Sequence, residues 1–222
     1  MIDYRLYLVT DDPSRYRGDW LENVVAAVEG GVTAVQYRDT ESAPPERLER
    51  ARALQDALRG RAALIINNEP ELAAALGADG VHVGQGDRPP SEVRRIVGAR
   101  CEIGYSITDI GQLESRCGEI AASDALGIGP VFDARKTKAD AAPEMGLAGF
   151  GRIVASLGEA ERRRLGVVAI GGITRGNAAG VLAAGADGLA LVSAFSMAAD
   201  PFAAARELKR LTASVQQQGI TS

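Results

Sequence analysis

The chain has one histidine and two cysteines among its 222 residues. Because these side chains are so few, we expect no cluster of histidine and cysteine metal ligands, and two thiols make no disulfide framework. Cys101 and Cys117 fit no metal or redox spacing, so we expect two reduced thiols in a cytoplasmic protein. His82 is the only histidine, and the sequence shows no serine–histidine–aspartate arrangement typical of a hydrolase.

Long apolar runs and an excess of positive charge are also missing. A segment that spans a bilayer needs roughly 18 apolar residues in a row, and no run in this chain approaches that length. The first residues, Met1–Arg5, lack the charged-then-apolar layout of a signal peptide. A net charge of −4 argues against nucleic acid as the main partner, because phosphate binding there needs a basic face. We therefore expect a protein without membrane or nucleic-acid partners.

Short apolar runs alternate with helical segments along the whole chain. The predicted strands are Leu6–Thr10, Ala34–Arg38, Ala63–Ile66, Gly80–Val83, Glu102–Tyr105, Ala125–Gly129, Val167–Ile170 and Gly188–Leu191. The predicted helices are Leu21–Glu29, Glu46–Leu58, Glu69–Leu76, Glu92–Val97, Ile110–Arg116, Phe150–Leu157, Asn177–Ala184 and Pro201–Thr212. Eight strands, each followed by a helix and mostly apolar on both faces, predict an α/β fold with a parallel sheet closed into a (β/α)8 TIM barrel. We expect a single domain over residues 1–222, since no linker divides the chain.

Glycine turns and two polar segments complete this organisation. Three short segments that begin with a glycine, Gly30-Gly-Val, Gly77-Ala-Asp-Gly and Gly185-Ala-Asp-Gly, each follow a predicted helix and precede a strand. This placement is typical of a helix C-cap and a tight turn. The longest segment without apolar periodicity is Asp133–Gly149, and Asp11–Asp19 is a shorter one. Long loops in compact domains are often lids or binding loops, so we expect both to lie over one mouth of the barrel.

Polar side chains follow the second, third and fourth strands. Arg38 offers a planar fork suited to a phosphate, and Gln36 lies on the same side of its strand; a surface ion pair between Arg38 and Asp39 is the alternative. Asn67 and Asn68 end the third strand. Asp87 follows the fourth strand, at the correct end for a Mg²⁺ ligand, although an aspartate in a loop is also a common turn former.

The ends of the last four strands carry small and cationic residues. The fifth ends at Ser106, whose hydroxyl can bond a phosphate oxygen, and the sixth leads into Lys136, Thr137 and Lys138. These lysines either clamp a diphosphate or belong to a solvated basic loop. Small residues also end the seventh and eighth strands, where barrels often bind phosphate through backbone N–H groups, and these are Gly171, Gly172, Val192 and Ser193. His82 lies inside the fourth strand, which favours a hydrogen-bonded core or wall position over an acid–base role.

Taken together, these segments resemble thiamine-phosphate synthases and their TenI-like relatives. The resemblance extends in order over nearly the whole chain and rests on Tyr7–Asp11, Gly31–Asp39, Leu64–Asn67, Gly77–Asp87, Ile103–Ser106, Gly127–Phe132, Thr137–Lys138, Val168–Ile173 and Val192–Ala194. It implies an enzyme that joins hydroxymethylpyrimidine diphosphate to a thiazole phosphate with loss of pyrophosphate. In that family the mechanism is dissociative, and Mg²⁺ and cationic side chains stabilise the leaving pyrophosphate.

The resemblance also implies roles for individual residues. The pyrimidine diphosphate would be bound by Gln36, Arg38, Asn67, Ser106 and Lys138, of which Arg38, Ser106 and Lys138 would be catalytic. The thiazole phosphate would be bound by Thr137, Gly146, Gly172, Val192 and Ser193. Asp87 would hold Mg²⁺, with Asn68 as a second ligand. A homodimer is plausible.

Three positions depart from the pattern of that family. Thr40 stands where a lysine is usual, and Asn68 stands where a second metal-binding aspartate is usual. The usual Pro-x-Thr-x-Thr-Lys loop is replaced by the segment Asp133–Lys138, whose sequence is Asp-Ala-Arg-Lys-Thr-Lys. Arg135 or Lys136 can supply the missing cation from this altered loop. Because Asn68 carries no charge, we expect weaker Mg²⁺ binding than in typical members.

Two other functions compete with the synthase. A TenI-type thiazole tautomerase would carry a histidine two residues after the serine of the fifth strand, and this chain has Thr108 there. A degenerate relative that binds a phosphate ligand without turnover is the second alternative, and the three departures are its evidence. A generic phosphate-binding isomerase would need a paired acid and base at the strand ends, and no such pair stands out.

Overall fold

Eight parallel strands close into a barrel in the computed structural model of the protein, which describes residues 1–135, 137 and 141–219. The strands follow one another in chain order around the barrel and are β1 (Leu6–Val9), β2 (Ala34–Tyr37), β3 (Ala63–Asn67), β4 (Gly80–Val83), β5 (Glu102–Ile107), β6 (Ala125–Ile128), β7 (Gly166–Ile170) and β8 (Gly188–Leu191). Each observed strand end lies within two residues of the predicted one. The prediction of a TIM barrel is confirmed.

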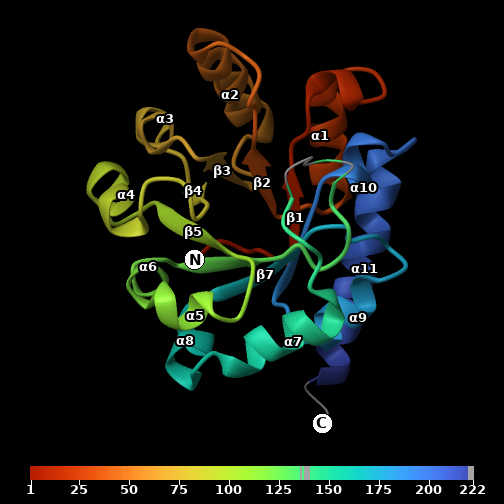
Figure 1. The fold of residues 1–222 in the computed structure, drawn as a ribbon. Coiled ribbons are helices and arrows are strands. Elements are labelled where there is room, and N and C mark those ends of the chain that lie inside the picture. Colours follow the sequence, from red (N-terminus) through yellow and green to blue (C-terminus); the bar gives the residue numbers. More distant parts are fainter. Residues whose placement is uncertain (136, 138–140, 220–222) are drawn as a thin grey trace.

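Helices surround the barrel, as Figure 1 shows. They are α1 (Trp20–Gly30), α2 (Pro44–Leu58), α3 (Pro70–Leu76), α4 (Pro90–Val97), α5 (Gln112–Ser115), α6 (Cys117–Ala121), α7 (Gly146–Ser156), α8 (Glu159–Arg164), α9 (Ala178–Ala183), α10 (Ser193–Ser196) and α11 (Pro201–Gly219), with the short 3-10 helix η1 (Pro13–Arg15) before α1. Prolines begin several of them because the first helical N–H has no partner inside the helix. Within the described residues, no helix has the length and apolar character to span a membrane.

Three features of the helices differ from the prediction. The helix predicted over Ile110–Arg116 is observed as the shorter α5, which ends because Arg116 has non-helical backbone angles (φ −121°, ψ 23°). Helices α6, α8 and α10 were not expected. The loop expected to run to Gly149 is shorter, because α7 begins at Gly146, whose N–H donates to the carbonyl oxygen of Val131 at 2.9 Å.

Apolar side chains form two separate layers. The larger layer lies between the strands and the helices. The smaller one fills the interior of the barrel toward the amino ends of the strands and consists of Tyr4, Tyr7, Val9, Ala34, Ile65, Ala125, Val168 and Ala190. Below it the N-terminal segment covers the barrel, because the Ile2 N–H and the Tyr4 hydroxyl both donate to the Glu102 carboxylate, at 2.6 and 3.2 Å. The interior is therefore closed at the amino ends of the strands.

A repeated clamp joins neighbouring strands at this closed end. Asp79, Asp124 and Asp187 each stand directly before an even-numbered strand. The carboxylate of each accepts the backbone N–H of the second residue in the preceding odd-numbered strand, at 2.8 Å in all three cases. Thr33, directly before β2, has a similar role, since its hydroxyl accepts the N–H of Leu6, the first residue of β1, at 3.1 Å. The Gly-Ala-Asp-Gly sequences thus supply both the predicted turn and a hydrogen-bond acceptor.

Replacing one clamp should weaken the barrel. We expect Asp79→Ala to lower the free energy of unfolding by about 1.5 kcal/mol, because the Leu64 N–H loses a charged acceptor. The matched variant Asp79→Asn keeps an acceptor oxygen and should lose less. Chemical denaturation of the three proteins measures both values, and an Ala variant as stable as the wild type would contradict the role of the clamp.

Candidate active site

A cavity of about 510 Å³ opens at the carboxyl ends of the strands. Inward-pointing positions of the strands form its wall, because alternate residues of a barrel strand face the interior. The lining includes most of the predicted substrate-binding residues, namely Gln36, Arg38, Asn67, Ser106, Thr137, Gly172, Val192 and Ser193. Residues more than 150 positions apart in the sequence therefore share one cavity.

Four predicted residues do not belong to this described lining. Gly146 lies at the start of α7, and Asn68 and Asp87 are exposed at the rim. Lys138 lies outside the described residues, so its predicted role stays a prediction. Conversely, Tyr7, His82, Gln85 and Thr108 line the cavity although they were not predicted to bind substrate. The alternation of inward- and outward-facing residues along each strand could have identified Tyr7 and His82 as cavity-lining residues.

Arg38 is held in place by its backbone, and its side chain has no partner among the residues that the structure describes. The Thr10 hydroxyl accepts the Arg38 N–H at 2.8 Å and donates to the Arg38 carbonyl oxygen at 3.1 Å. Within the described part of the chain, the guanidinium group makes no hydrogen bond or ion pair. An unpaired guanidinium at the wall of a cavity is suited to an anionic ligand.

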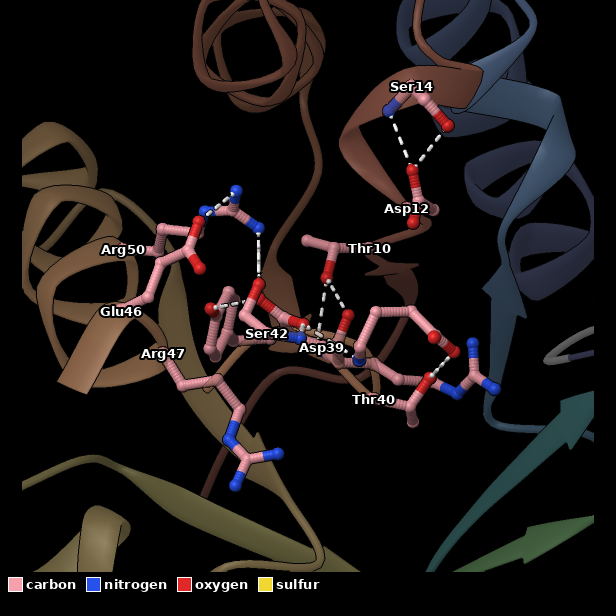
Figure 2. A network of polar contacts seen from close by, with 12 residues as sticks. Thr10, Asp12, Ser14, Asp39, Thr40, Ser42, Glu46, Arg47 and Arg50 are labelled. Atoms are coloured by element: carbon pink, nitrogen blue, oxygen red, sulfur yellow. Dashed lines mark hydrogen bonds and ion pairs between the residues drawn. The ribbon is translucent and has the colours of Figure 1, made fainter. Parts of the chain in front are cut away.

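Asp39 does not neutralise Arg38, because its carboxylate turns toward α2 (Figure 2). One oxygen accepts the Tyr37 hydroxyl at 2.9 Å and Arg50 Nη1 at 3.2 Å, and the other accepts the N–H groups of Glu41 and Ser42. Burial opposes ionisation of Asp39, but the hydrogen bonds from Ser42 and Tyr37 outweigh it and lower its pKa to about 2. The predicted alternative of an Arg38–Asp39 pair is wrong.

Other cations near the mouth are already engaged. Arg47 Nε lies 3.1 Å from the carboxylate of Glu69, and Figure 2 shows its guanidinium directed away from Arg50. Arg135, a predicted replacement for the missing lysine, donates to both oxygens of Asp133, at 2.8 and 3.1 Å. Lys136, the other candidate, lies outside the described residues. Arg38 is the one arginine in the described lining of the cavity, and its charge is available.

The loops after β7 and β8 bring backbone close to the cavity. Gly171 and Gly172 both have positive φ values, of 99° and 60°. A Cβ atom at Gly172 would lie 2.7 Å from the carbonyl oxygen of Asp133, so a larger residue does not fit. Ser193 is the first residue of α10, where the N–H has no partner inside the helix. These features fit the predicted phosphate-binding use of both loops.

Asn68 and Asp87 both lie near the end of β4. The Asn68 N–H donates to the His82 carbonyl oxygen at 2.8 Å, and Asp87 Oδ2 accepts the Gly84 N–H at 2.7 Å. Among the described residues, no group of three or more histidine, cysteine or acidic side chains can hold a metal. One carboxylate and one carboxamide nevertheless fit Mg²⁺, which commonly takes its remaining ligands from substrate phosphates and water.

Comparisons with known proteins agree with this arrangement. Residues 6–195 match the sequence profile of a family described as thiamine monophosphate synthase. The chain belongs to this family. It is 45% identical over 213 residues to a thiamine-phosphate synthase of Laribacter hongkongensis, which covers 95% of this chain and 96% of that protein. It is 38% identical over 221 residues to a thiamine-phosphate synthase of Chloroflexus aurantiacus, and this match covers 99% of this chain and 98% of that protein.

Solved structures related to the family show the same fold. The thiamine phosphate pyrophosphorylase of Pyrococcus furiosus superimposes with a TM-score of 0.81 at 31% identity and covers 96% of this chain and 97% of its own. The thiamine phosphate pyrophosphorylase of Bacteroides thetaiotaomicron, at 14% identity and a TM-score of 0.64, supports the fold alone. The sequence resemblance to this family is confirmed.

Thr40 and Asn68 still depart from the pattern expected for the family. Thr40 is exposed, and its hydroxyl donates to Glu41 Oε1 at 3.2 Å. Asn68 has a φ of +58°, a left-handed conformation that asparagine and aspartate adopt more readily than other residues with a side chain. An aspartate at position 68 would therefore fit the same backbone. The loss of charge there has no backbone cause.

Proposed function

We propose that the protein is a thiamine-phosphate synthase, which condenses hydroxymethylpyrimidine diphosphate with thiazole phosphate to give thiamine phosphate and pyrophosphate. The observation that carries this proposal is the cavity of a chain of this family, where several hydroxyl and amide groups gather with one arginine that has no partner among the described residues. Such a site suits anionic phosphates better than it suits nucleophilic catalysis. The products belong to thiamine biosynthesis.

In the proposed reaction, the carbon–oxygen bond to the diphosphate breaks and the pyrophosphate leaves with the bonding electrons. The thiazole nitrogen then donates its lone pair to the carbon that remains. Arg38, Asn67 and Ser106 would bind the diphosphate, and Arg38 would stabilise the charge that develops on it. Gln36, whose Nε2 donates to the Tyr7 hydroxyl at 2.6 Å, is fixed in the wall where the pyrimidine would lie.

The thiazole phosphate would lie on the opposite side of the cavity. Thr137, Gly172, Val192 and Ser193 would bind its phosphate there, and Gly146 would act from the start of α7. Asp87 and Asn68 would hold Mg²⁺ at the rim. When bound, the metal supplies positive charge to the leaving pyrophosphate.

A direct assay tests the proposed function. Purified protein is incubated with hydroxymethylpyrimidine diphosphate, thiazole phosphate and Mg²⁺, and thiamine phosphate is followed by thiochrome fluorescence. We expect product only when both substrates are present. Isomerisation of the thiazole phosphate alone would favour the tautomerase. Absence of product, with thiazole phosphate still raising the melting temperature, would favour a relative that binds without turnover.

Restoring the charge at position 68 should strengthen metal binding. We expect Asn68→Asp to lower the Mg²⁺ concentration for half-maximal activity by about tenfold, because one more carboxylate attracts the cation. The backbone at this position accepts either residue, so stability should change little. A Mg²⁺ titration of both proteins measures the shift. Wild-type activity that saturates at low micromolar Mg²⁺ would contradict weak binding.

A cytoplasmic location and a small-molecule role are parts of the same proposal. Both cysteines are free thiols, and burial raises the pKa of Cys101 to about 11. The homodimer stays a prediction.

A further inference from the structure

The imidazole of His82, the only histidine of the chain, lies within hydrogen-bond distance of a hydroxyl group of the proposed site. His82 lies within β4, and its Nε2 is 2.9 Å from Ser106 Oγ on β5. Both residues line the cavity. Ser106 is a proposed substrate-binding residue, whereas the family resemblance assigned no role to His82. The contact between them therefore needs an explanation of its own.

Two glycines make room for the imidazole ring. Gly104 lies beside His82 in the sheet, and Gly127 lies beside Ser106 on the next strand. A Cβ atom at Gly127 would lie 2.8 Å from His82 Cε1, and one at Gly104 would overlap Nδ1. The ring thus occupies space that any other residue at these positions would fill. Its position is set by the strands and not by a loop.

The remaining freedom of Ser106 is rotation about its side-chain bond. Its backbone is fixed by pairing in the sheet, and its carbonyl oxygen accepts Gln85 Nε2 at 2.8 Å. A serine hydroxyl has three staggered rotamers, and the bond to His82 selects one of them. Removing the imidazole would leave the hydroxyl free to leave that orientation.

We infer that His82 is a positioning residue, which holds the Ser106 hydroxyl in the orientation that the substrate meets. This inference rests on the proposed function. The reaction proposed above transfers electron pairs between carbon, oxygen and nitrogen and needs no proton from the protein. The imidazole therefore acts by fixing a hydrogen bond and not as an acid or base.

A spectroscopic test examines the contact without any turnover. Because the chain has one histidine, protein without a histidine tag gives a single set of imidazole ¹⁵N signals. We expect Ser106→Ala to shift the Nε2 signal clearly, because its hydrogen-bond partner is lost. Arg135→Ala, which changes an exposed pair with Asp133, should leave the signal in place. An unchanged signal in Ser106→Ala would overturn the inference, even if the proposed function proved wrong.

Kinetics then test the consequence. We expect His82→Leu and Ser106→Ala each to lower kcat/KM by about 100-fold, because a misplaced group at the reacting centre costs about this much. The double variant should be no worse than either single variant, since both remove the same interaction. His82→Gln keeps a hydrogen-bonding group and should retain most activity with an unchanged pH profile.

Other outcomes would overturn the positioning role. Losses that multiply in the double variant would mean that His82 and Ser106 act independently. A pH profile that loses one limb in His82→Gln would mean that the imidazole exchanges a proton. Thermal unfolding identifies variants that fail to fold, and if His82→Leu is one of them, His82→Gln and the imidazole signals decide the question.

Discussion

Arg38→Ala is expected to lower kcat/KM for the pyrimidine diphosphate by about 10³-fold, the cost of removing a charged stabiliser from a reacting centre. The Arg38 side chain lines the cavity, and Asp39 is occupied by Tyr37 and Arg50 instead. Its full charge is therefore available to a leaving pyrophosphate. Because the guanidinium has no partner among the described residues, its removal should leave the melting temperature almost unchanged.

Two further variants make this prediction specific. Arg38→Lys keeps the charge but loses the planar fork, so its activity should lie between those of the wild type and the alanine variant. Arg135→Ala is the matched control, because Arg135 is exposed and paired with Asp133. If Arg135→Ala costs as much as Arg38→Ala, the loop after β6 supplies the decisive cation, and the role given to Arg38 is wrong.

The barrel itself could be predicted from the sequence because its strands carry an unusually simple signal. Segments such as Leu64–Ile66 are apolar on both faces, since one face packs on helices and the other on the barrel interior. Glycines after the helices, such as Gly77 with its φ of 62°, marked the turns. Eight repeats of this pattern admit few other closed arrangements.

Short helices escaped prediction because they have too few turns to show a period. Helix α10 spans only Ser193–Ser196 and follows a strand directly. For α7 only the start was missed, because Gly146, Gly149 and Gly151 weaken the helical signal there. The Met145 and Gly146 N–H groups hold this start against the loop that follows β6. In these places tertiary contacts decide the structure.

The sequence also leaves open which side chains of the site form hydrogen bonds or ion pairs with one another. Arg38 and Asp39 are neighbours, and a local ion pair was one interpretation. In the structure, alternation places Arg38 on the cavity wall, while Asp39 meets Arg50 of α2, eleven positions away. The same holds for His82, whose contact with Ser106 depends on the register of β4 and β5. Such pairings follow from the sheet and not from sequence proximity.

Asp87→Ala is expected to abolish most of the activity, with a loss of about 10³-fold, because Mg²⁺ typically stabilises a leaving phosphate by several kcal/mol. The effect has two possible causes in this structure. Asp87 Oδ2 accepts the Gly84 N–H at 2.7 Å, so the residue also shapes the turn after β4. A loss of activity in the alanine variant alone would not separate metal binding from the turn.

Asp87→Asn separates them, because a carboxamide oxygen can still accept the Gly84 N–H but carries no charge. If Asp87 holds the metal, the asparagine variant should be nearly as inactive as the alanine variant and should need far more Mg²⁺. If Asp87 only forms the turn, the asparagine variant should keep most of its activity. The neighbouring Asn68 makes this experiment more decisive, since with no second carboxylate at that position the remaining charge of the proposed site rests on Asp87.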